Sequence, residues 1–158
     1  HMLVRELKQE IDKIFLENEE YQNFFITILS FGFKYGIPAD CDLVFDVRFL
    51  PNPYYIPELK KKTGNDFEVY DFEVYDYVMK SEQAKEFDEK LFDMIKFLVP
   101  NYITEGKNQL VIGIGCTGGK HRSVSLANAL AKHMQELPYS LKVEHRDIEK
   151  DAKTKGEN

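Results

Sequence analysis

The spacing of apolar residues predicts helices and strands that alternate along the chain. Residues 3–18 place apolar side chains near every third or fourth position, which predicts an amphipathic helix, and residues 81–102 repeat this pattern directly after Ser81. Between these two segments, residues 23–36 and 41–53 are rich in β-branched and aromatic residues and are broken by glycines or prolines, as strands are. This alternation favours an α/β fold with a small, largely parallel sheet flanked by helices.

A sharp change from strand to helix is predicted in the second half of the chain. Residues 109–115, QLVIGIG, form an almost continuous apolar run, which is typical of a strand covered on both faces. Apolar residues return at helical spacing from Val124 to Met134, and residues 141–145 predict a last short strand. Because ligands of open α/β sheets bind beyond the carboxyl ends of the strands, the segment between residues 113 and 123 is the expected ligand site.

The length and composition of the chain fit one domain. The 158 residues are 43% hydrophobic and 30% charged, which is ordinary for a globular protein. His1-Met2 is typical of the remnant of a purification tag, so we expect a single α/β domain over residues 3–150 and a flexible charged tail over residues 151–158. Since we find no apolar run of roughly 18 residues and no set of cysteines for a disulfide framework, we expect no membrane contact and a cytoplasmic location.

The formal net charge of -6 is divided unevenly between the two parts of the chain. Residues 1–106 carry 12 Lys and Arg against 21 Asp and Glu, whereas residues 107–158 carry 9 against 6. The second part is therefore net positive and favours an anionic partner. Chance, with a solvated tail, is the alternative that charge alone leaves open.

The loop after the apolar strand, GCTGGKHRS, contains the residue types that bind an anion with several oxygens. Glycines let backbone amides converge, and the first turn of a helix offers unpaired N–H groups with partial positive charge. An arginine can bind a phosphate through two hydrogen bonds, and a lysine adds a point charge. We therefore predict a phosphate site made by Gly115, Cys116, Thr117, Gly118, Gly119, Lys120, His121, Arg122 and Ser123, with Lys34 reaching in from the end of the first strand.

A Walker A motif and a metal site are not supported by the spacing. Walker A requires Gly where Ile114 stands and Ser or Thr where His121 stands, so we predict no nucleoside triphosphate hydrolysis at this loop. We also find no His/Cys pair with metal-ligand spacing, and we expect neither a metal nor a cofactor.

A second motif, Cys-x5-Arg-Ser, matches the pattern of cysteine phosphatases at Cys116, Arg122 and Ser123. In such an enzyme the Cys116 thiolate would attack a phosphate, and Asp46 would be the candidate general acid. Asp46 and Arg48 stand two apart in a predicted strand and should point to the same side, which makes Arg48 a further ligand candidate. An exposed salt bridge between them is the alternative.

Three stretches, SFGFKYGIPADCDLVFDVRFLPNPYY, VIGIGCTGGKHRSV and EHRDIEK, together resemble the C-terminal domain of the RapZ family over about residues 25–150. These bacterial RNase adaptor proteins are also described as a P-loop nucleotide-binding family. The resemblance implies a fold like a phosphofructokinase subdomain and a metabolite-sensing adaptor rather than an enzyme. The family's N-terminal domain carries Walker motifs, and the resemblance implies that this chain lacks it.

The resemblance also implies ligands and partners. In the best-studied branch the domain binds glucosamine-6-phosphate and a regulatory RNA, which it presents to a ribonuclease, and family members form oligomers. The family's sugar-phosphate pocket corresponds to Thr117, Gly118, His121 and Arg122, and Tyr54 stands where the family has a histidine. The RNA contacts are expected from the basic residues at the C-terminal end, namely Arg146, Lys150, Lys153 and Lys155.

Three further features are left open by the sequence. The motif DFEVY at 66–70 is repeated at 71–75, which we interpret as a local duplication or an acidic aromatic surface segment that could serve as an interface between copies. His145 and Arg146 end the last predicted strand and could close the ligand site, whereas His133 is predicted to be a surface residue of a helix.

Overall fold

The computed structural model describes residues 23–62 and 73–150. Within these ranges the chain forms a four-stranded sheet of order β2-β3-β1-β4 in which every neighbouring pair is parallel. The strands are β1 (Phe25–Gly32), β2 (Leu43–Asp46), β3 (Gln109–Cys116) and β4 (Ser140–His145). The helices are α2 (Glu73–Met79), α3 (Glu82–Thr104) and α4 (Arg122–Met134), and two 3-10 turns are η1 (Phe33–Tyr35) and η2 (Pro53–Tyr55). The predicted α/β class with a parallel sheet is confirmed.

Some predictions concern parts of the chain outside the described residues. These are the helix over residues 3–18, the first DFEVY copy at 66–70 and the charged tail over residues 151–158. Lys153 and Lys155 belong to that tail.

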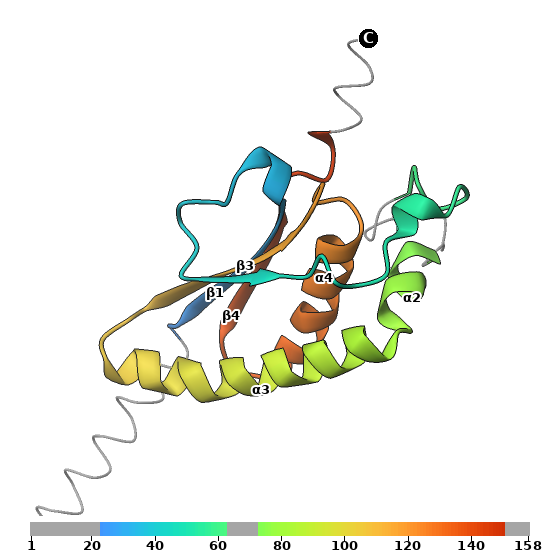
Figure 1. Ribbon diagram of the computed structural model, residues 1–158. Helices are drawn as coiled ribbons and strands as arrows, with labels where there is room; N and C mark the ends of the chain where they lie inside the picture. The colour runs from blue at the N-terminus through green and yellow to red at the C-terminus, as the bar shows by residue number, and fades with distance from the viewer. Residues whose placement is uncertain (1–22, 63–72, 151–158) are drawn as a thin grey trace, which may run out of the picture.

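The core lies between one face of the sheet and the helices. In β1 the side chains of Ile26 and Ile28 are fully buried, and in β3 their register partners Leu110 and Ile112 point to the same face. Helix α4 packs against β1, β3 and β4 on this face, and α2 and α3 pack against α4 (Figure 1). Burial of α4 is the reason why its apolar residues occur nearly all round the helix.

Helix α3 begins where the sequence predicted. The hydroxyl oxygen of Ser81 accepts a hydrogen bond from the Ala84 amide at 3.2 Å, which caps the first turn. Leu91, Ile95 and Val99 then lie on one side of the helix and are buried in the core.

Helix α2 was not predicted from the sequence. It begins at Glu73, inside the second DFEVY copy, and buries Val74 and Val78 against the rest of the domain. The interpretation of residues 71–75 as a surface segment is therefore wrong for Val74. Two buried valines four residues apart are too few for a periodicity that sequence reasoning could separate from a strand or a loop.

Strand β2 is shorter than predicted, and this changes the position of Arg48. The strand ends at Asp46, and Arg48 lies in the turn that follows it. The Arg48 guanidinium turns back to the Asp46 carboxylate, with Nη2 2.6 Å from Oδ2, and stacks over the Phe33 ring. The expectation that both side chains share a strand face is wrong, and the salt bridge that was the alternative is present.

Candidate anion-binding site

A cavity of about 360 Å³ lies at the carboxyl end of the sheet, at the loop between β3 and α4. The turns η1 and η2 lie on either side of this loop (Figure 1). Most of the predicted site lines the cavity, together with residues from η1 and from the chain around η2. The lining residues are Lys34, Asn52, Tyr54, Tyr55, Lys60, Cys116, Thr117, Gly118, Lys120, His121 and Arg122.

One glycine of the loop, Gly119, and one at the end of β1, Gly32, are required because the loop presses against the end of this strand. Gly119 has a positive φ of 76°, and a Cβ placed on it would lie 2.6 Å from the Gly32 nitrogen. A Cβ on Gly32 would in turn lie 2.4 Å from the carbonyl carbon of Gly118. Because no side chain fits between these backbones, the glycines at these positions fix the path of the loop. The Lys34 amide also donates to the Thr117 carbonyl at 3.2 Å, which joins η1 to the loop.

The amino end of α4 faces the cavity and supplies positive potential. His121 precedes the helix, and no side chain caps its first turn by a hydrogen bond. The amides of that turn have no carbonyl partner within the helix, which is the arrangement that binds phosphate groups. Arg122 adds a full charge, and its guanidinium is held by the Thr117 hydroxyl at 3.2 Å and by the Arg48 carbonyl.

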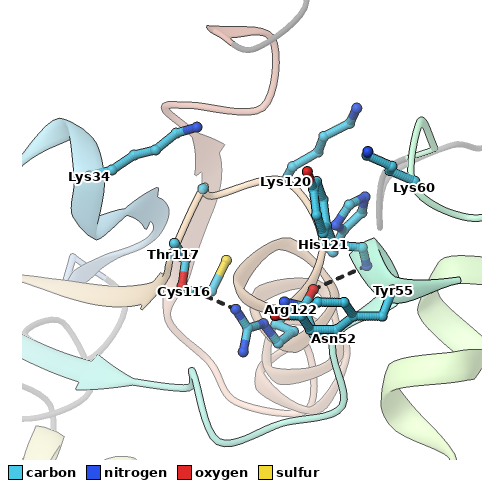
Figure 2. A pocket seen from close by; sticks show the side chains of 11 residues that line it. Lys34, Asn52, Tyr55, Lys60, Cys116, Thr117, Lys120, His121 and Arg122 are labelled. Carbon is cyan, nitrogen blue, oxygen red and sulfur yellow. Dashed lines mark hydrogen bonds between the residues drawn. The ribbon is translucent and has the colours of Figure 1, made fainter.

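Two lysines flank the loop, and a third, Lys120, is part of it. Figure 2 shows Lys34 reaching toward the loop from one side and Lys60 and Lys120 on the other, with Arg122 below Thr117. Among the described residues the cavity is therefore lined by four permanent cationic side chains and by no Asp or Glu. Such a lining favours a ligand with two negative charges.

His121 is a buried polar residue of the cavity wall. In the part of the chain that the structure describes, its Nε2 has no hydrogen-bond partner, so it is available to a polar group of a ligand. Burial lowers the pKa of His121, and the charges of Lys120 and Arg122 lower it further, whereas hydrogen bonds to the backbone of Lys60 and Lys62 act in the opposite direction. The neutral imidazole is therefore favoured, with one nitrogen as a donor and the other as an acceptor.

The Cys116 thiol lies at the base of the loop and is buried. Its Sγ accepts a hydrogen bond from the Gly119 amide at 3.2 Å and lies 3.1 Å from the Ser123 hydroxyl oxygen. Asp46, the candidate general acid, is not among the residues that line the cavity. Its hydrogen bonds with Arg48 hold its pKa below the ordinary value, so this carboxyl group is a poor proton donor at neutral pH.

The sequence missed three residues of the cavity. Asn52, Tyr55 and Lys60 reach the loop from a segment about sixty residues earlier in the chain, whereas Tyr54 of the same segment was predicted. The Asn52 side-chain oxygen accepts the Tyr54 amide at 3.1 Å and begins η2, and the Lys60 ammonium lies 4.4 Å from the centroid of the Tyr54 ring. The PNPYY run suggested a turn and the family resemblance placed Tyr54 at the site, but nothing in the sequence indicated that Asn52, Tyr55 and Lys60 line the cavity as well.

The predicted RNA-binding residues of the described chain lie beside this site. The Arg146 guanidinium and the Lys150 ammonium both contact the buried carboxylate of Asp147, at 2.8 and 2.6 Å. Asp147 also accepts the Gly32 amide at 2.7 Å, so it holds the segment after β4 against the strand that the loop touches. Arg146 does not line the cavity, and His145 points instead to Ser30 and Asn128, at 2.6 and 3.1 Å.

Of the other predicted ligand residues, Gly115, Gly119, Ser123 and Arg48 lie next to the cavity without lining it. Arg48 interacts with the site through its carbonyl oxygen, which accepts a hydrogen bond from the Arg122 guanidinium, and not through its own charged side chain. Over residues 23–62 and 73–150 we find no group of three or more His, Cys, Asp or Glu side chains arranged to hold a metal ion. No helix in the same ranges has the length and apolarity needed to cross a bilayer.

Comparison with known proteins adds a family relationship. The model of the family described as the RapZ C-terminal domain matches residues 24–149. Proteins named "Nucleotide-binding protein" from Lachnoclostridium phytofermentans and Agathobacter rectalis are both 66% identical to the chain, over 94% and 96% of its length and 50% of theirs. A nucleotide-binding protein of Thermoanaerobacter sp. is 59% identical over 90% of the chain and 49% of its own length. The chain thus spans about half the length of these curated relatives.

Proposed function

Because the chain belongs to the RapZ C-terminal domain family, we propose that it is a metabolite-sensing adaptor domain that binds a phosphorylated sugar, such as glucosamine-6-phosphate, in the cavity at the GCTGGKHRS loop. The phosphate lies at the amino end of α4, and the sugar extends toward Tyr54 and Tyr55. A regulatory RNA binds at the C-terminal end and is presented to a ribonuclease.

The observation that supports this proposal most is that Lys34, Lys60, Lys120 and Arg122 line one cavity next to the amino end of α4. A cavity of about 360 Å³ suits a ligand of the size of a hexose phosphate. The tight contact between the Gly119 and Gly32 backbones fixes the loop before a ligand arrives, so little conformational entropy is lost on binding.

Isothermal titration calorimetry tests the sugar-phosphate site. We expect saturable binding of glucosamine-6-phosphate and about tenfold weaker binding to a Lys34→Met variant, since a tenfold loss corresponds to about 1.4 kcal/mol for one lost charge contact. Lys90→Met, which removes an exposed lysine of α3 outside the cavity, should bind like the wild type. Equal affinity for sulfate and for the sugar phosphate would contradict sugar recognition.

A cysteine phosphatase is the second candidate function, and the environment of Cys116 favours it. Its sulfur lines the cavity where the nucleophile of the Cys-x5-Arg-Ser pattern would lie, and it is held by the Gly119 amide and lies beside the Ser123 hydroxyl. Turnover of p-nitrophenyl phosphate that is lost in Cys116→Ser would support the enzyme and overturn the adaptor proposal. We expect no turnover, because the Asp46 carboxyl group is bound to Arg48 and lies outside the cavity wall.

RNA binding is supported by the basic residues around the C-terminal end. Arg146 and Lys150 lie on the side of the domain from which the chain continues to Lys153 and Lys155. Fluorescence anisotropy with a labelled RNA hairpin at two salt concentrations tests this part. We expect affinity to fall as salt rises, and to fall further when Lys153 and Lys155 are replaced by glutamine, because phosphate contacts release counterions. Salt-independent binding would contradict it.

A further inference from the structure

A second cavity, separate from the anion site, lies among α2, α3 and α4 and measures about 640 Å³. It lies on the side of α4 away from the GCTGGKHRS loop, at the helix's carboxyl half. It is lined by Tyr75, Met79, Lys85, Asp88, Glu89, Ala129, Lys132, His133, Gln135 and Glu136. None of these residues takes part in the function proposed above.

The unusual feature of this cavity is a buried carboxylate in its wall. Asp88 lies on α3 and is only 5% exposed, yet its Oδ1 has no hydrogen-bond partner among residues 23–62 and 73–150. An unpartnered polar atom at such a position is unfavourable because it has lost its hydrogen bonds to water, so buried acids normally have donors for both oxygens. The other oxygen, Oδ2, lies 3.0 Å from Nδ1 of His133 on α4.

His133 supplies only part of what Asp88 requires. The contact has the length of an ion pair and acts to lower the pKa of Asp88, but within the described residues its angle leaves Nδ1 of His133 without a well-aligned hydrogen bond. The imidazole is held from its other side by the Phe92 ring, whose centroid is 5.3 Å away. Burial raises the pKa of Asp88 and His133 offsets only part of this effect, which indicates that the carboxylate has too little positive charge around it.

The rest of the lining selects the kind of group that could complete the site. The remaining charges of the wall are two lysines and two glutamates, Lys85, Lys132, Glu89 and Glu136, so they attract neither sign of ligand strongly. Tyr75 and Met79 add an aromatic and an apolar wall. The buried carboxylate therefore decides which ligand fits, and it requires a donor with positive charge next to an apolar body.

We propose that this cavity is a binding site for a small molecule that carries a primary ammonium group, which donates to Oδ1 of Asp88 while its apolar part lies against Tyr75 and Met79. The ammonium donates to Oδ1 of Asp88, while His133 contacts the other oxygen, Oδ2. Both carboxylate oxygens then have a partner. Recognition of this kind discriminates strongly against an isostere without the ammonium, because the buried oxygen then stays unpartnered.

Protein NMR with a matched pair of probes tests the site. Benzylammonium and benzyl alcohol have similar size and differ in the charged donor. We expect benzylammonium to shift the amide signals of residues around Asp88 and His133 in a saturable way, with a Kd of about 1 mM, and benzyl alcohol to bind at least tenfold more weakly. Equal shifts from both probes, or no saturable shift from benzylammonium, would overturn the proposal.

Variants separate the carboxylate from the general charge of helix α3. Asp88→Asn keeps the shape and should weaken benzylammonium binding about tenfold or more, whereas Asp93→Asn removes an exposed carboxylate of the same helix and should leave binding unchanged. Unchanged binding to a folded Asp88→Asn variant would also overturn the proposal. If that variant does not fold, the comparison of the two probes on the wild-type chain still decides the question, and neither result depends on sugar-phosphate binding at the other site.

Discussion

At the scale of single residues, Asp147 joins several parts of the domain next to the candidate site, a role that the sequence motifs did not predict. Its carboxylate receives the Gly32 amide and the charges of Arg146 and Lys150, and only 1% of the residue is exposed. Burial would raise the pKa of Asp147, but the hydrogen bonds from Arg146, Gly32 and Lys150 outweigh burial and hold the pKa below its ordinary value. The folded domain therefore depends on this negative charge.

Replacing Asp147 by asparagine should destabilise the domain strongly. Asparagine can still accept the Gly32 amide, but it leaves Arg146 and Lys150 without their counter-charge beside a buried position. We expect the free energy of unfolding, measured by urea denaturation, to fall by about 3 kcal/mol. Sugar-phosphate affinity should fall as well, because Gly32 contacts the loop backbone.

Asp42→Asn is the matched control for this experiment. The Asp42 carboxylate also accepts hydrogen bonds from a backbone amide, that of Val111, and from the Lys107 ammonium. Its side chain, however, is 32% exposed. Water compensates for an exposed charge pair, so the cost should be about 1 kcal/mol or less. Equal losses in the two variants would show that the burial of Asp147 has no special effect.

At the scale of elements, the sequence predicted those with a clear local signal, either apolar residues at helical spacing or an apolar, β-branched run of the length of a strand. Strands β1, β3 and β4 and helices α3 and α4 are such elements, and the loop between β3 and α4 could be assigned because glycines, cations and a helix start coincide there. Helix α2 and the contributions of Asn52, Tyr55 and Lys60 to the cavity could not be predicted. Val74 and Val78 show no period in isolation, and the approach of Asn52 and Lys60 to the loop is a tertiary contact without a local sequence signal.

The close contact between the backbones of β1 and the ligand loop can be tested by substitution of Gly119. Gly119→Ala forces a positive φ on alanine and places a Cβ 2.6 Å from the Gly32 nitrogen and 2.8 Å from the Phe31 carbonyl carbon. Strain of this kind and overpacking together cost about 3 kcal/mol or more, so we expect a large loss of stability and no measurable sugar-phosphate binding. Urea denaturation and calorimetry measure the two effects.

Gly106→Ala isolates the contribution of backbone angle alone. Gly106 has a positive φ of 94°, but a Cβ on it meets nothing within 4 Å. This variant should lose only about 1–2 kcal/mol and keep its affinity for the ligand. A Gly119→Ala variant that behaves like Gly106→Ala would show that the two backbones are not in tight contact.

At the scale of the whole molecule, buried histidines set the response to acid. Burial lowers the pKa of His121 and of His145 from the ordinary value of 6.5. As the pH falls, the unfolded chain binds protons at these residues before the folded chain does, so acidification lowers the free energy of unfolding. Burial raises the pKa of Asp88 from its ordinary value of 3.8. Its contribution to the free energy of unfolding therefore changes in the opposite direction with pH, and it does so in a pH range below that of the histidines.

We therefore expect the free energy of unfolding to be smaller at about pH 5.5 than at about pH 7.5, a window set by the histidine pKa. Urea denaturation at the two pH values measures the difference. His145→Gln should reduce that difference, because glutamine does not titrate and can replace part of the hydrogen bonding to Ser30 and Asn128. Stability that is equal at both values, or larger in acid, would contradict this account.

The two outer strands of the sheet limit how copies of the chain can associate. Strand β2 offers only four residues at its open side and ends at Asp46, whose carboxylate is clamped by Arg48. On the opposite margin, β4 exposes Lys142 and Glu144 on its solvent side. Short or charged margins resist the addition of a further strand. Growth of the described sheet into a continuous ribbon is thereby disfavoured, so we expect copies of this domain to associate through surfaces other than the sheet edges.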